Sequence, residues 1–135
     1  LDDCYNANTA SMAAALRTVA ASAPPDGRAF AVLGDMLELG GEEAAMHASI
    51  GRLCAELGFA GLVGVGPLAA QYVAGAQAGG LGPERLLHTE DPAEAAATMA
   101  RWTRPGDWIL VKASRGLRLE RVIDNMAAAF AAPSL

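Results

Sequence analysis

Short apolar runs alternate along this chain with longer stretches in which apolar residues recur every three or four positions. The clearest runs are 29–33, 61–65 and 108–112, and the stretches between them have the spacing of amphipathic helices. Because parallel strands need a long crossover, this alternation predicts repeated βα units. We therefore expect an α/β fold: a Rossmann-like three-layer domain with a mostly parallel sheet of five to six strands and helices on both faces.

Turn and cap residues set the expected boundaries. Asn8 is a suitable N-cap for a first helix, and Asp91 followed by Pro92 marks the start of another. The expected strands are 29–33, 61–65, 86–89 and 108–112, with the end of one more at 1–3. The expected helices start after Asn8, at Glu42, near Leu68, at Pro92 and near Leu119.

Length and charge narrow the function classes. A chain of 135 residues is expected to fold as a single domain, 1–135. The net charge of −5 argues against a nucleic-acid partner, since such partners need clustered Lys and Arg. No apolar run approaches the ~20 residues needed to span a bilayer. We expect a cytoplasmic protein without a membrane partner, and the start at Leu1 suggests a piece of something longer.

Ligands of parallel α/β sheets collect where loops leave the carboxyl ends of the strands. Three polar loops meet this description, namely 3–8, 35–41 and 113–118. They are widely separated in the sequence, but the topology would bring them to one edge of the sheet. A shared binding site at that edge is the prediction.

The first loop combines acids, a phenol and amides just before a helix. Asp3, Tyr5, Asn6 and Asn8 are candidate nucleotide-binding residues, because free N–H groups at a helix N-terminus attract anions. A purely structural role is the alternative, in which Asn8 only caps the helix and Asn6 forms an Asx turn.

The second loop lies between Gly34 and Gly41. Asp35 and Glu38 are candidates to bind an ammonium group, with Met36 beside them. His47 follows one helical turn into the next element, where it could face this loop. The alternatives are a structural loop with solvated acids, and a histidine that only packs or lies on the surface.

The third loop ends the last expected strand. Lys112, Ser114 and Arg115 place an ammonium, a hydroxyl and a guanidinium within four positions. The guanidinium is suited to a carboxylate, and the ammonium to a phosphate or carboxylate. A polar strand end without a ligand is the alternative.

Several catalytic motifs are missing from the sequence. There is no GxxxxGK[ST] phosphate loop, no GxGxxG after the first strand, and no spacing typical of a metal site. We therefore assign no catalytic residue and no metal ligand to this chain, which alone has no means of activating ATP.

At the three loops the sequence resembles the Mur ligase family, in the branch that adds D-alanyl-D-alanine. That branch carries the motifs DDSYNANP, LGDMLELG with a downstream His, and VKGSRG. They match residues 2–9, 33–40 with His47, and 111–116 of this chain, in the same order. The departures are Cys4 for Ser, Thr9 for Pro and Ala113 for Gly. Cys4 puts any role of that hydroxyl in doubt.

The resemblance implies the C-terminal domain of a monomeric three-domain ligase, with the N-terminal and central ATPase domains absent here. ATP and Mg²⁺ would be held mainly by the central domain, and the isolated domain would be inactive. A UDP-N-acetylmuramoyl-tripeptide would become an acyl phosphate that the amine of D-alanyl-D-alanine attacks. By position, Asp3 would meet the ribose, Asp35 the ammonium of the dipeptide and Arg115 its carboxylate.

Two alternatives belong to other classes. A response-regulator receiver domain also carries paired acids, a Thr and a Lys at strand ends, and Asp2, Asp3, Thr89 and Lys112 fit that outline. Its phosphoacceptor Asp should end the third strand, where Gly66 stands instead. A non-catalytic nucleotide-binding module is the second alternative, although the dinucleotide glycine loop is lacking.

Overall fold

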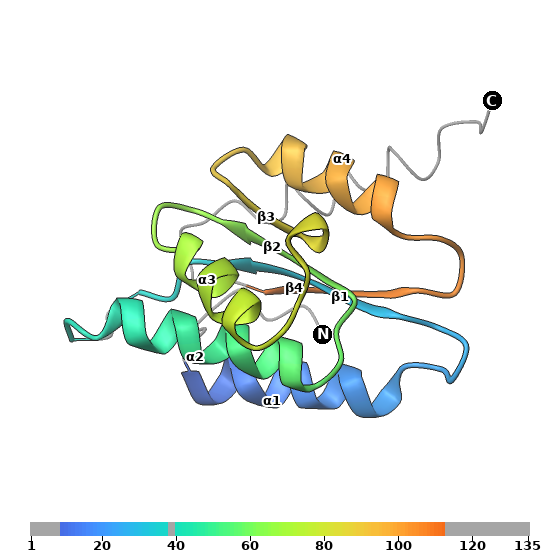
Figure 1. Cartoon of the computed structure of the whole chain (residues 1–135), viewed down its shortest axis with the longest axis horizontal. Helices are drawn as coiled ribbons and strands as arrows, with labels where there is room; N and C mark the ends of the chain where they lie inside the picture. Colours follow the sequence, from blue (N-terminus) through green and yellow to red (C-terminus); the bar gives the residue numbers. More distant parts are fainter. Residues whose placement is uncertain (1–8, 38–39, 113–135) are drawn as a thin grey trace.

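A sheet of four parallel strands forms the centre of the computed structural model, which describes residues 9–37 and 40–112 (Figure 1). The strands are β1 (Ala29–Gly34), β2 (Gly61–Val65), β3 (Leu86–Thr89) and β4 (Trp108–Lys112). These are the four strands expected from the sequence at 29–33, 61–65, 86–89 and 108–112. The described part has fewer strands than the five to six expected, and the strand end expected at 1–3 lies outside it.

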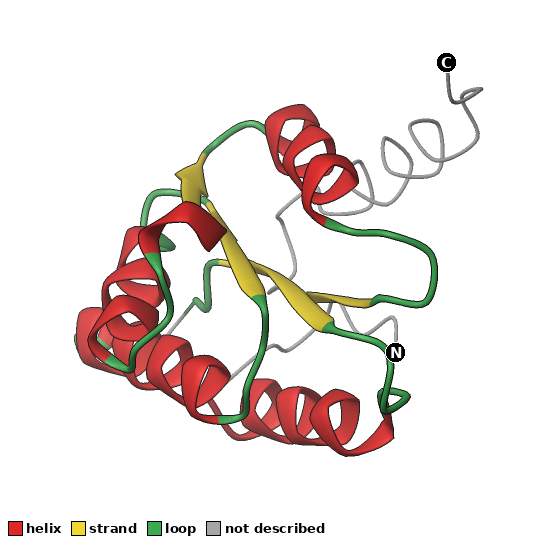
Figure 2. Cartoon of the chain, turned by 45° about the vertical axis from the view of Figure 1, so that its right-hand side comes forward, coloured by secondary structure: helices red, strands yellow, loops and turns green. Residues whose placement is uncertain are grey.

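Helices cover both faces of this sheet (Figure 2). They are α1 (Thr9–Ser22), α2 (Glu43–Glu56), α3 (Ala70–Ala78) and α4 (Pro92–Trp102), with a short 3-10 turn η1 (Pro83–Arg85) that was not predicted. As predicted, Asp91 caps α4, because its carboxylate accepts a hydrogen bond from the amide of Ala93 at 2.9 Å. The three-layer α/β class is confirmed. The helix expected near Leu119 lies outside the described residues.

Alternation along β1 divides the core into two layers. Ala29, Ala31 and Leu33 pack against α1, α2 and α3, whereas Phe30 and Val32 pack against α4. All six residues of β1 are buried. A strand buried on both faces must be apolar throughout, which is why this run showed no polar alternation in the sequence.

The strand order β3-β2-β1-β4 brings two distant segments together. The chain moves outward from β1 to β3, then returns across the sheet so that β4 pairs with the other side of β1. Leu33 lies opposite Lys112 in this pairing. The ends of β1 and β4 therefore lie side by side, at the point where the strand order reverses and α/β folds bind ligands.

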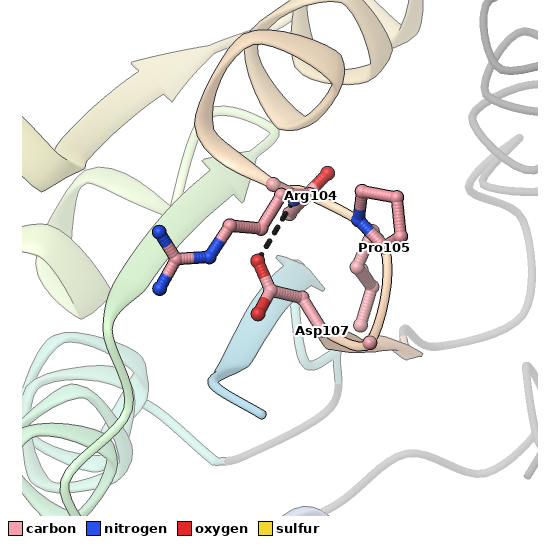
Figure 3. Close-up of a pocket in the computed structure, with 6 residues that line it drawn as sticks. Arg104, Pro105 and Asp107 are labelled. Carbon is pink, nitrogen blue, oxygen red and sulfur yellow. Dashed lines mark hydrogen bonds between the residues drawn. The ribbon is translucent and has the colours of Figure 1, made fainter. Parts of the chain in front are cut away.

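At the opposite edge of the sheet, where the strands begin, an ion pair joins two of them. The carboxylate of Asp107 accepts hydrogen bonds from the guanidinium and the backbone amide of Arg28, at 2.9 and 3.0 Å. It also accepts from the backbone amide of Arg104 at 2.9 Å, the contact drawn in Figure 3. Burial opposes ionisation of Asp107, but the hydrogen bonds from Arg28 and Arg104 outweigh it and lower the pKa of this carboxyl. The start of β1 is thus joined to the start of β4.

Two glycines allow α2 and α3 to pack at backbone distance. A Cβ atom at Gly51 of α2 would lie 1.9 Å from the carbonyl oxygen of Tyr72, and one at Gly75 of α3 would lie 1.9 Å from that of Ala48. Each helix therefore lacks a side chain where the other helix crosses it. This contact brings the Tyr72 side chain of α3 under the end of β1.

Replacing Gly75 with alanine should lower the free energy of unfolding by about 2 kcal/mol, since the added methyl group meets main-chain atoms and forces the helices apart. Helix propensity alone predicts the opposite sign, a gain of about 1 kcal/mol. Urea unfolding of the chain measures the difference. The exposed neighbour Ala74 supplies the control, because Ala74→Gly should cost about 1 kcal/mol through propensity alone. A more stable Gly75→Ala variant would contradict the close packing.

Candidate functional site

Four of the predicted site residues lie within the described part of the chain. Asp35 and Met36 follow β1, His47 lies on α2, and Lys112 ends β4. The others lie outside the described residues: Asp3, Tyr5, Asn6, Asn8, Glu38, Ser114 and Arg115. The structure therefore brings the beginnings of the second and third polar loops to the same edge of the sheet.

Asp35 follows β1, and its side chain reaches the turn between β2 and α3. Its carboxylate, only 3% exposed, accepts from the amide of Leu68 at 3.0 and 3.2 Å through its two oxygens. A Cβ atom at Gly66 would lie 2.5 Å from Asp35 Oδ1, so only glycine leaves room for the carboxylate here. Gly66 also has a φ of +126°, which disfavours other residues. Asp35, at the end of another strand, thus binds the turn that leads into α3.

Burial dominates the ionisation of Asp35. Loss of solvent raises the pKa of this carboxyl, while the amides of Leu68 and Ala69 and the nearby His47 and His88 oppose the rise. A carboxylate has four lone-pair positions, so the amides do not exhaust its acceptor capacity. The predicted role of Asp35 towards an ammonium group stays a prediction.

His47 faces the loop after β1, but from beneath it. Its ring is fully buried, and Nε2 accepts from the backbone amide of Met36 at 2.9 Å. Nδ1 lies 2.6 Å from the carbonyl oxygen of Glu43, which can only accept. In this arrangement Nε2 is the acceptor and Nδ1 is the donor. Both ring nitrogens of His47 therefore contact main-chain atoms.

Tyr72 is a functional candidate that the sequence interpretation missed. Its hydroxyl donates to the carbonyl oxygen of Gly34 at 2.7 Å. Its ring contacts that of His47, with centroids 4.7 Å apart and planes tilted by 51°. Burial, and then the charge of Asp35, raise the pKa of Tyr72 above its usual range, so the phenol remains a donor. The available signal was a tyrosine at a core position, because a buried hydroxyl needs a partner.

Lys112 and Leu37 differ in their access to solvent. Lys112 is only 2% exposed at the end of β4, beside Leu33. Leu37 is 45% exposed and leaves the sheet directly after the fixed backbone of Gly34 to Met36. A buried cation next to an exposed loop suits the binding and orientation of a polar ligand. The described residues at this edge offer no nucleophile with an adjacent base, so binding is the chemistry they support.

Thr89, at the end of β3, binds residues at the start of α4. The hydroxyl of Thr89 donates to the carboxylate of Glu94 and accepts from the amide of Asp91 at 3.0 Å. Gly66, rather than an acid, follows β2. The Thr and Asp positions that a receiver domain would use for phosphorylation are therefore occupied by a cap and a glycine turn, and nothing in the structure supports that alternative.

A pocket of about 400 Å³ lies at the opposite edge of the sheet (Figure 3). It is lined by Thr103, Arg104, Pro105, Gly106, Asp107 and Ile109. Most of this wall is the turn between α4 and β4, and the Asp107 carboxylate is already bound by Arg28. The pocket is distant from the carboxyl ends of the strands, so we place the candidate site at the other edge.

Among residues 9–37 and 40–112, no group of three or more His, Cys, Asp or Glu side chains could hold a metal ion. No helix in these ranges is long and apolar enough to cross a membrane.

Comparison with known families gives one match that covers most of the chain. The family described as Mur ligase, glutamate ligase domain, matches residues 1–115. This match includes the first two polar loops and the third as far as Arg115.

Individual relatives agree with this match. The UDP-N-acetylmuramoyl-tripeptide--D-alanyl-D-alanine ligase of Mycobacterium tuberculosis is 37% identical over 95% of the chain. The crystal structure of MurF from Acinetobacter baumannii has a TM-score of 0.79 at 30% identity, over 94% of the chain. MurF ligase from Thermotoga maritima in complex with ADP has a TM-score of 0.78 at 27% identity, over 96% of the chain. The chain spans 28%, 27% and 28% of these three proteins, respectively.

The raised pKa of Asp35 predicts a pH-dependent difference from an Asp35→Asn variant. The folded state holds the proton of Asp35 more tightly than the unfolded state, whose pKa is near 3.8. The unsubstituted chain should therefore gain stability relative to Asp35→Asn as the pH falls through the raised pKa towards 3.8. Urea unfolding at several pH values between about 7 and 4 measures this difference.

Asp107→Asn is the matched control, because the folded pKa of Asp107 is lowered instead. Its stabilising contribution should be constant above the unfolded pKa of 3.8 and be lost only as the pH falls further. If Asp35→Asn showed the same pH profile as Asp107→Asn, the burial assigned to Asp35 would be wrong.

Proposed function

Because this chain belongs to the Mur ligase family, we propose that it is the C-terminal domain of the ligase that joins D-alanyl-D-alanine to UDP-N-acetylmuramoyl-tripeptide. The observation that carries the proposal is the 37% identity, over 95% of the chain, to a relative that bears the name of this activity. The name of this relative specifies a substrate class, which the family match does not. Its similarity also extends over more of the chain than the family match does. The full-length protein would work on peptidoglycan precursors in the cytoplasm, as a monomer.

The proposed reaction forms one amide bond at the expense of one ATP. The terminal carboxylate of the tripeptide attacks the γ-phosphorus of ATP, which gives an acyl phosphate and ADP. The amine of D-alanyl-D-alanine then attacks the acyl carbon, the C–O bond to phosphate breaks, and the amine loses a proton. The products are the pentapeptide precursor, ADP and inorganic phosphate.

The share of this domain is to present the dipeptide and to cover the nucleotide. Polar groups at the carboxyl edge of the sheet support this share, since Lys112 is buried there and the loop after Asp35 begins beside it. Asp35 and Arg115 are proposed for the ammonium and carboxylate ends of the dipeptide. Domain closure would then gain rate through proximity and exclude water from the acyl phosphate.

The nucleotide side of the proposal rests on the first polar loop. Asp3, Tyr5, Asn6 and Asn8 are proposed to contact ATP, with Asp3 at the ribose. A relative of the same fold is named as a complex with ADP, which is compatible with a nucleotide at this domain. Among the described residues no group fits Mg²⁺. We propose that the central domain of the full-length enzyme holds this ion, together with most of the ATP site.

The activity itself is tested with the purified full-length protein. It should release ADP from ATP only when both UDP-N-acetylmuramoyl-tripeptide and D-alanyl-D-alanine are present. A coupled ADP assay and mass spectrometry of the pentapeptide product measure this dependence. ADP release that ignores the dipeptide, or a different amine in the product, would contradict the proposed substrate.

Replacing Arg115 with alanine in that enzyme should raise KM for D-alanyl-D-alanine about tenfold and KM for ATP less than about twofold, because a charge-assisted contact to the dipeptide carboxylate is lost. Arg101→Ala is the control, since this α4 side chain donates to Thr98 on its own helix and should leave both constants unchanged. Equal increases in the two constants for Arg115→Ala would count against the assigned role.

A further inference from the structure

We propose that His47 and Tyr72 are positioning residues for the ligase reaction, which fix the loop after β1 from beneath without touching a ligand. This inference rests on the proposed function and adds to it. It gives His47 a different role from direct contact with the substrate, and it assigns a role to Tyr72, which no sequence motif indicated.

The two side chains act on the main chain of the loop. The Tyr72 hydroxyl donates to the carbonyl oxygen of Gly34 at 2.7 Å, and His47 Nε2 accepts from the amide of Met36 at 2.9 Å. Asp35 lies between these two anchor points and is itself held by the amide of Leu68. Three consecutive residues are therefore each fixed by a different contact, and together these contacts set the direction in which Leu37 leaves the sheet.

Burial separates positioning from ligand binding. Both rings are fully buried, and their nitrogen and hydroxyl groups are all paired with main-chain groups, so neither ring presents a polar atom to a molecule at the carboxyl edge. The exposed side chain begins one residue later, at Leu37. Any influence of His47 and Tyr72 on a bound dipeptide must therefore pass through the backbone that they hold.

The anchors themselves are tied to helix packing. His47 Nδ1–H donates to the carbonyl oxygen of Glu43 in the first turn of α2. Tyr72 is placed by the contact of its own backbone with Gly51. The rings of His47 and Tyr72 also touch each other. The packing of α2 against α3 thus sets the position of the loop. Displacements of less than about 1 Å in residues that support a site can reduce its function.

Simple core filling would not need these atoms. An apolar side chain could fill the same volume, and burying a hydroxyl or an imidazole is unfavourable unless its polar atoms are paired. Here both ring nitrogens of His47 and the hydroxyl of Tyr72 are paired, each with a main-chain group and two of them with the loop. This choice of partners is what a support for the loop requires.

Tyr72→Phe in the full-length ligase is the sharpest test, because it keeps the ring and removes only the hydroxyl. KM for D-alanyl-D-alanine should rise about fivefold, while KM for ATP stays within about twofold. Thr103→Val is the matched control. Its hydroxyl also donates to a main-chain carbonyl at 2.7 Å, that of Met99, but at the opposite edge of the sheet. The control should lower the melting temperature by a similar amount and leave KM for the dipeptide unchanged.

A second pair of variants tests His47. His47→Leu removes both hydrogen bonds, whereas His47→Gln keeps an oxygen that can accept from the amide of Met36. The glutamine variant should recover most of the affinity for the dipeptide that the leucine variant loses. If His47→Leu does not fold, Tyr72→Phe and His47→Gln still decide the matter.

The result that would overturn the inference is a KM for the dipeptide that is unchanged in Tyr72→Phe, or raised equally in Thr103→Val. A change that follows melting temperature alone would also overturn it. The unsubstituted enzyme separates this failure from failure of the proposed function. If it used a different amine, the proposed substrate would be wrong, and the same ratios measured with that amine would still test the positioning role.

Discussion

Where the chain passes from a buried central strand into a loop, its polar groups must still be paired. The end of β1 is where this constraint applies in the structure. Gly34, Asp35 and Met36 bring a carbonyl, a carboxylate and an amide into an interior with little water, where unpaired polar groups are costly. Tyr72, the amide of Leu68 and His47 supply the partners. Two helices are thereby fixed relative to the central strand, and the rest of the candidate site is built upon that arrangement.

The same constraint links stability to binding. The contacts that satisfy the end of β1 also hold the start of the exposed loop at the same edge of the sheet as Lys112, because β4 pairs with β1 and ends beside it. A close approach of α2 and α3 is needed for Tyr72 to reach Gly34, and this approach depends on Gly51 and Gly75. The proposed binding of a dipeptide and a nucleotide at this surface would gain from such support, since preorganised groups lose less freedom on binding.

Local patterns in the sequence predicted what depends on neighbouring residues. The buried strand of 29–33 and the Asp91 cap followed from such patterns, and both are confirmed. Long-range partners could not be predicted in this way. Spacing suggested that Asp35 binds a ligand, but could not show that its carboxylate meets an amide 33 positions away at Leu68. Gly75 is a second example, because glycine is unfavourable inside a helix by propensity and its reason here is the backbone of a second helix.

Hydrogen exchange of the Met36 amide tests the central claim most directly. This amide follows the end of a strand and would exchange rapidly in an ordinary surface loop. Here it donates to the fully buried ring of His47, so it should exchange about as slowly as amides inside β1 and become labile only on global unfolding. Exchange of the Met36 amide as fast as that of the loop glycines Gly40 and Gly41 would contradict the account.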